Sequence, residues 1–138
     1  MVNNDSHFLR LIPFSPSPNP FPTSRKLPGP RYDLQKIQER ILVPDEIRLF
    51  TPDCANDVQD LGWTIENVLE LLHAATTDNY RDSEWCATGK GFAVDCDAYA
   101  LNFDSASATQ SSRAPEMFLK FGFRPNFLIL IAISCHPS

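Results

Sequence analysis

The sequence predicts an α+β protein in which two or three N-terminal helices pack on one small antiparallel β-sheet. Helical periodicity is confined to residues 33–75, and strand-like alternation occupies residues 79–136. Helices followed by strands are typical of the α+β class, in which the helices cover one face of the sheet. The length of 138 residues fits a single domain with a core of its own.

Residues 1–30 are expected to form a proline-rich arm outside this domain, which we place at residues 31–138. The arm has many prolines, little charge and no sustained periodicity. It is therefore predicted to be extended or flexible, and its apolar side chains could hold it against the body: Phe8, Leu11, Phe14 and Phe21. A ligand for a proline-recognition domain is the alternative, but the arm carries no clear docking motif.

Three helices are predicted from their start and stop signals. Asp33, Thr51 and Thr64 are the expected N-caps, because their side-chain oxygens can accept hydrogen bonds from the free N–H groups of a first turn. Pro44 and Gly62 end the first two helices. The helices therefore span about residues 34–41, 52–61 and 65–75, with a short extended segment at 46–50.

Strands are predicted at residues 80–86 and 94–103 and in a C-terminal hairpin. In the first hairpin strand, apolar residues alternate with others, so one face is buried: Met117, Leu119, Phe121 and Phe123. A turn at residues 124–126 leads to residues 127–133, which are apolar at every position. This second strand is expected in the interior of the sheet, and it is too short to cross a bilayer, which needs ~20 apolar residues.

The composition argues against several classes of function. A formal net charge of −5 and a pI near 5.0 disfavour tight non-specific nucleic-acid binding, although they leave room for a local basic groove. The chain has no phosphate-binding glycine loop, no G-x-S-x-G and no H-E-x-x-H. The first residues lack the features of a secretory signal, so we expect a cytoplasmic protein. We also expect no membrane segment and no cofactor.

The cysteines allow one metal-site hypothesis. Cys86, Cys96, Cys135 and His136 could together bind zinc, but none of them shows the C-x-x-C spacing that makes such a site specific. A nucleophilic pair of Cys96 and His136 is a rarer alternative. We expect four free thiols in a reducing compartment.

From Tyr32 onward, short motifs follow one another in a characteristic order. They are Tyr-Asp-Leu before the first helix, Leu-Gly between two helices, Asp78-Asn79-Tyr80-Arg81, Asp97-Ala98-Tyr99, Phe118-Leu119-Lys120, and a terminal apolar strand ending Ile133-Ser134-Cys135-His136. Their order and spacing resemble the MqsR family of toxins, part of the RelE-like group of small bacterial ribonucleases. The resemblance covers the chain from Tyr32 to its end and leaves out the arm.

The resemblance implies the toxin of a type II toxin–antitoxin system, an endoribonuclease that cuts mRNA without a metal. The implied partners are the mRNA substrate and a cognate antitoxin protein. Such cleavage needs a base for the 2′-OH, a cation for the phosphate and an acid for the leaving oxygen. We expect Arg81 and Lys120 to supply the cation and His136 to act as acid or base. The Tyr99 hydroxyl could replace the family's tyrosine hydroxyl, which is lost at Phe118.

Four positions depart from the family pattern. The family has lysine, glutamine, tyrosine and lysine where this chain has Arg81, Cys96, Phe118 and His136. Asp97, Tyr99, Lys120 and Ser134 match as they stand. The substitutions leave open a reduced activity or a different cleavage mechanism.

Each candidate also has a structural explanation. Arg81 could be a solvated surface residue, Tyr99 a packed ring, Lys120 a guard of the sheet edge and His136 part of a frayed end. The second hypothesis is therefore a catalytically inactive RelE-like module that binds or regulates another protein. A ribonuclease requires Arg81, Tyr99, Lys120 and His136 to converge in one groove, because they must act on the same atoms.

Overall fold

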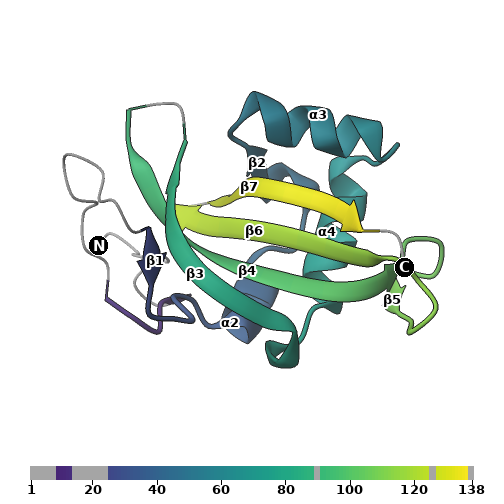
Figure 1. Ribbon diagram of the computed structural model, residues 1–138, viewed down its shortest axis with the longest axis horizontal. Helices are drawn as coiled ribbons and strands as arrows, with labels where there is room; N and C mark the ends of the chain where they lie inside the picture. Colours follow the sequence, from purple (N-terminus) through teal and green to yellow (C-terminus); the bar gives the residue numbers. More distant parts are fainter. Residues whose placement is uncertain (1–8, 14–24, 89–90, 125–126, 137–138) are drawn as a thin grey trace.

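In the computed structural model, the chain forms a seven-stranded sheet with three helices on one face (Figure 1). The structure describes residues 9–13, 25–88, 91–124 and 127–136. The helices in these ranges are α2 (Leu34–Arg40), α3 (Pro52–Asp60) and α4 (Ile65–Ala74). The strands are β1 (Lys26–Leu27), β2 (Ile47–Leu49), β3 (Tyr80–Ala87), β4 (Ala93–Asp104), β5 (Thr109–Gln110), β6 (Glu116–Arg124) and β7 (Phe127–His136).

The three predicted helices are confirmed, and two of the three predicted side-chain caps form, those of Asp33 and Thr51. Thr64 is the N-cap of α4, but its hydroxyl donates to Asn67 Oδ1 and accepts no hydrogen bond from the first turn. The Asp33 carboxylate accepts a hydrogen bond from the Lys36 amide, and the Thr51 hydroxyl accepts one from the Cys54 amide at 3.1 Å. Gly62, just beyond α3, has a φ of 71°, a conformation that glycine adopts without steric cost. Two 3₁₀ turns, η1 (Pro44–Glu46) and η2 (Thr77–Asn79), link the helices to the strands.

The α+β class is confirmed, but the sheet is larger and more mixed than predicted. Its order is β1-β3-β4-β6-β7-β2, with β5 paired to β4. All pairs are antiparallel except β2–β7, which is parallel. The segment at residues 46–50 was expected to be extended, but its pairing with β7 depends on contacts about 80 residues away in the chain. Neither that pairing nor the strand at Lys26–Leu27 follows from local patterns.

The C-terminal hairpin lies in the interior of the sheet, as predicted. Strand β7 lies between β6 and β2, so its position in the interior is confirmed. The alternating residues of β6 are buried against the helices: Met117, Leu119, Phe121 and Phe123. They belong to one core with the inward side chains of β4 and with α2, α3 and α4.

The opposite face of the sheet, here called the outer face, carries the alternate residues of β3, β4 and β6. In the described residues its buried cluster contains no helical side chain and consists of Cys86, Val94 and Cys96, with Ile131 packed against them. The far end of the β3–β4 hairpin bends toward β7 (Figure 1). There the Phe92 ring meets the Phe50 ring, with centroids 6.2 Å apart.

The described parts of the proline-rich arm are built into the fold. Strand β1 pairs with β3, and the Leu11 amide donates to the Arg31 carbonyl at 2.8 Å. Leu9 is buried in the core, whereas the predicted anchor Leu11 is 56% exposed, because this segment turns the other side of its chain inward. The other expected anchors, Phe8, Phe14 and Phe21, lie outside the described residues. No described helix has the length and apolarity to span a membrane.

Candidate functional site

Tyr99, one of the four predicted site residues, lies on the helix-covered face. Its ring is stacked on Phe121, with centroids 5.8 Å apart and planes 5° apart, and the Tyr80 ring meets it edge-on. The residue is only 1% exposed. Burial, together with the nearby Asp97 carboxylate, raises the pKa of Tyr99 well above its ordinary value. Tyr99 is therefore a core residue in this fold.

Lys120 lies on the outer face, on the other side of the sheet from Tyr99. In the register of β4 and β6, Lys120 is opposite Ala98, and Tyr99 is opposite Leu119, so the two side chains alternate to different faces. The Lys120 ammonium is ion-paired with Glu84 and lies 5.8 Å from the centroid of the Phe118 ring. It is held within the sheet surface by these contacts.

Arg81 also lies on the outer face, at an irregularity in β3. The β3–β4 register shifts between Tyr80 and Asp82, so Arg81 is the extra residue of a bulge, which re-aims a side chain. Its guanidinium is 3.3 Å from the Glu116 carboxylate, and the two side chains are 57% and 41% exposed. This exposed ion pair joins β3 to the start of β6 across β4.

His136, the fourth candidate, is the last residue of β7. Its backbone lies directly opposite Glu116 in the antiparallel β6–β7 ladder. Its side chain lies outside the described residues.

The four predicted residues do not form one site. Tyr99 is separated from Arg81 and Lys120 by the sheet itself. Lys120 is four residues along β6 from Glu116, or roughly 13 Å at the rise of an extended strand. The structure does bring Arg81 to Glu116, opposite the register position of His136. Glu116 was not predicted; its only signal was its place at the start of the strand before Phe118.

The other two positions that depart from the family pattern also belong to the outer face. Phe118 is opposite Ser134 on β7 and opposite Ala100 on β4, and it is partly exposed. Cys96 is fully buried, and burial raises the pKa of its thiol well above the ordinary value. It is therefore not poised as a nucleophile.

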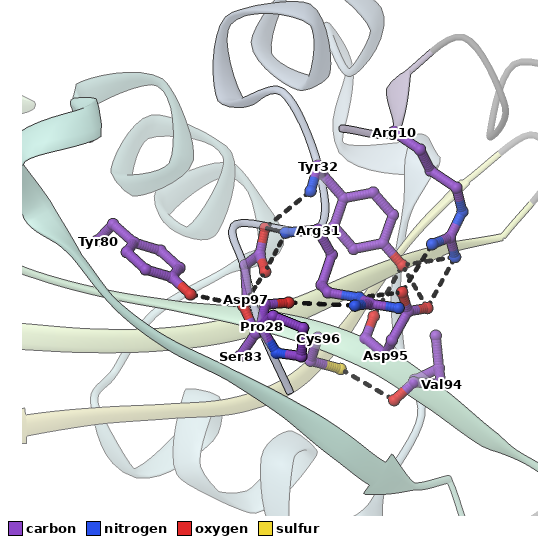
Figure 2. Close-up of polar contacts among 10 residues, drawn as sticks. All are labelled: Arg10, Pro28, Arg31, Tyr32, Tyr80, Ser83, Val94, Asp95, Cys96 and Asp97. Carbon is purple, nitrogen blue, oxygen red and sulfur yellow. Dashed lines mark hydrogen bonds and ion pairs between the residues drawn. The ribbon is translucent and has the colours of Figure 1, made fainter. Parts of the chain in front are cut away.

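A buried polar network, absent from the predicted site, lies where the N-terminal segments cross β4 (Figure 2). The Arg10 guanidinium donates to both oxygens of the Asp95 carboxylate, at 2.6 and 2.7 Å, and Arg31 Nε donates to the same group at 2.9 Å. The Tyr32 hydroxyl donates to the Asp95 carbonyl at 2.7 Å. Burial alone would raise the pKa of Asp95, but the two arginines outweigh it and hold the pKa below its ordinary value.

The carboxylate of Asp97, two residues further along β4, accepts hydrogen bonds from two backbone amides and one hydroxyl among the described residues. Its oxygens accept from the Arg31 amide at 2.9 and 3.0 Å, the Tyr32 amide at 3.0 Å and the Ser83 hydroxyl at 2.6 Å. Burial is the largest influence and raises the pKa of Asp97, and the neighbouring Asp95 adds to the rise. One signal in the sequence could have revealed the pair: two aspartates at i and i+2 in an apolar strand face the same side, here the core.

The chain's four cysteines are free thiols. Cys86 and Cys96 share one cluster, whereas Cys135 is opposite Met117 at the other end of the β6–β7 ladder. In the described ranges, no three His, Cys, Asp or Glu side chains are grouped so that they could hold a metal ion. The geometry of these residues does not support the zinc hypothesis.

Comparisons with known proteins identify no relative of this chain. Protein-family models, curated proteins and solved structures were searched, and none matches the chain. The resemblance to the MqsR family therefore rests on the motifs quoted above.

Proposed function

We propose that this protein is a metal-independent endoribonuclease whose reactive groups lie on the outer face at the Arg81–Glu116 ion pair. The observation that supports it is the meeting of a guanidinium and a carboxylate at the register position opposite a histidine. These three residue types can supply the cation, the base and the acid of RNA cleavage. The resemblance to a ribonuclease family points the same way.

In the proposed reaction, the Glu116 carboxylate takes the proton from a ribose 2′-OH. The 2′-oxygen attacks the adjacent phosphorus, the bond from phosphorus to the 5′-oxygen breaks, and a 2′,3′-cyclic phosphate forms. Protonated His136 gives its proton to the leaving 5′-oxygen. Arg81 binds the phosphate oxygens, where negative charge builds up in the transition state.

The exposure of the ion pair suits this role. An exposed pair typically contributes only about 0.2–1 kcal/mol, so Arg81 can exchange Glu116 for a phosphate at little cost. Tyr99 has no part in this reaction, because it lies on the other face of the sheet.

The charge on the outer face predicts weak binding of RNA. Ion pairs join Lys26, Arg81 and Lys120 to the carboxylates of Asp82, Glu84 and Glu116. Because these carboxylates balance the cations, the outer face should neutralise few RNA phosphates. Because each phosphate contact contributes about 0.7 to the logarithmic salt slope for a single strand, a shallow dependence on salt is expected.

The decisive experiment is cleavage of a transcript by the purified chain in the presence of a metal chelator. Glu116→Gln and His136→Ala should each reduce the rate about 10²- to 10⁴-fold, the usual value of general acid–base assistance. Arg81→Lys should retain more activity than Arg81→Ala if charge matters more than the guanidinium fork. Glu84→Gln removes a carboxylate of the same face that is paired with Lys120 and is the matched control.

Growth arrest on expression of the wild-type chain, and its relief by Glu116→Gln, would extend the result to cells. Circular dichroism of each variant excludes unfolding. If the wild-type chain neither cleaves RNA nor arrests growth, yet binds another protein tightly, the alternative of an inactive protein-binding module replaces this proposal. A full rate for Glu116→Gln would remove Glu116 as the base.

A further inference from the structure

A tyrosine-lined cavity of about 280 Å³ lies on the helix-covered face, on the other side of the sheet from Arg81 and Glu116. The N-terminal segments and the start of α2 form one wall, and η2, β3 and β4 form the other. Its walls include three tyrosines, one carboxylate and two leucines: Tyr32, Tyr80, Tyr99, Asp33, Leu11 and Leu34. The cavity is thus independent of the proposed ribonuclease site.

The Tyr99 hydroxyl is the unusual group of this cavity. Tyr80 and Tyr32 have partners for their hydroxyls, Ser83 Oγ at 2.7 Å and the Asp95 carbonyl at 2.7 Å. Tyr99 is almost completely buried, yet its hydroxyl makes no hydrogen bond with any residue that the structure describes. Among the described side chains, Arg10 Nε is the atom that is shielded from solvent without a hydrogen-bond partner, so the Tyr99 hydroxyl is reached from the cavity and can bond a ligand there.

Among the described residues that line the cavity, the charged one is an aspartate. No lysine or arginine of the described chain lines it, and Asp33 does. Asp33 Oδ1 caps α2, whereas Oδ2 has no hydrogen-bond partner in the described residues. The nearby arginines, Arg10 and Arg31, are bound to Asp95. After burial, the carboxylates of Asp97 and Asp33 are among the groups that raise the pKa of Tyr99, as expected in a negative potential.

We propose that this cavity binds a small primary alkylammonium ion. The ammonium donates to the Tyr99 hydroxyl oxygen, the Asp33 carboxylate balances its charge, and the tyrosine rings add cation–π attraction. The alkyl chain contacts Leu11 and Leu34. A neutral alcohol of the same size lacks the charge, and a quaternary ammonium lacks the N–H that Tyr99 accepts.

The test is a titration of the full chain with n-butylamine, which is protonated at neutral pH, followed by amide chemical shifts. Saturable shifts are expected at Gln35, Thr77 and Tyr80, around the cavity. 1-Butanol should produce none of them. Tetramethylammonium should bind more weakly than butylammonium.

Two variants separate the contributions. Asp33→Asn keeps the helix cap, because asparagine caps as well as aspartate, and should weaken butylammonium binding about fivefold. Tyr99→Phe should weaken butylammonium about tenfold and leave tetramethylammonium unchanged. Asp53→Asn, in the first turn of α3, removes the same charge away from the cavity and should have no effect.

Equal shifts with butanol and butylammonium would overturn the proposal, because they would show apolar binding without recognition of the charge. Absence of saturable shifts near the cavity at millimolar butylammonium would overturn it as well. Both results are independent of RNA cleavage, so the two proposals fail or succeed separately.

Discussion

Both oxygens of the buried Asp97 carboxylate accept hydrogen bonds from separate parts of the chain. Its two oxygens accept from the Arg31 amide, the Tyr32 amide and the Ser83 hydroxyl. The same carboxylate therefore joins the start of α2 to β3 and β4. Gly29 allows this close approach, because a Cβ at that position would clash with the Ser83 side chain and would lie 2.5 Å from the Tyr80 hydroxyl.

Asp97→Asn should lower the free energy of unfolding by about 1–3 kcal/mol, the cost of leaving a buried donor or acceptor without a partner. Either orientation of the amide places its NH₂ against an N–H or O–H that now donates to Asp97. Urea unfolding measures the change. Asp82→Asn is the control, since Asp82 is partly exposed and paired with Lys26. Equal losses for the two variants would contradict the assigned role of Asp97.

At the scale of elements, the N-terminal segment of residues 9–13 behaves as part of the folded domain. Leu9 enters the core, the Asp33 amide donates to the Leu9 carbonyl at 2.7 Å, and Arg10 binds Asp95 with both ends of its guanidinium. The Arg10 and Asp95 side chains are both almost fully buried. The segment thus covers one end of the sheet and one wall of the cavity.

Arg10→Ala should destabilise the protein by about 3 kcal/mol, because removal of one partner leaves a buried charge poorly compensated. Arg31 remains bound to Asp95, so the protein should still fold. Thermal unfolding measures the loss, and limited proteolysis should show faster cleavage within the first 30 residues. Arg113→Ala, at an exposed arginine, is the control. A change within about 0.5 kcal/mol, typical of surface substitutions, would show that the segment does not depend on this ion pair.

For the molecule as a whole, the two buried aspartates predict a distinctive response to acid. The pKa of Asp95 is lower in the folded state than in the unfolded state, so its contribution is complete above about pH 4 and is lost as the pH falls through the folded-state value. The pKa of Asp97 is raised by folding, so its effect has the opposite sign and stability rises slightly as Asp97 becomes protonated. Stability should therefore hold in mild acid and fall below about pH 4.

Carbon-13 NMR of the side-chain carboxyls can follow this response in the wild-type protein. On acidification, Asp97 should become protonated before Asp95. Urea unfolding at about pH 6 and about pH 3 should show the accompanying loss of stability. Titration of Asp95 before Asp97 would reverse the predicted assignment of the two carboxyls.

The sequence by itself determined the helices, their ends and most of the strands. Asp33, Thr51 and Gly62 act through hydrogen bonds and dihedral angles within a few residues, so their effects are legible locally. The alternation of β6 and the apolar run of β7 likewise predicted which side chains are buried and which strand is interior.

Only the tertiary structure decided which side chains meet. The register between β4 and β6 separates Tyr99 from Lys120, and the bulge at Arg81 joins that residue to Glu116, 35 positions away. The pairing of Arg10 with Asp95 spans 85 positions, and the parallel contact of β2 with β7 spans a similar distance. Such contacts depend on the packing free energy of the whole core, and no pattern within a short window of sequence specifies the partner across such a loop.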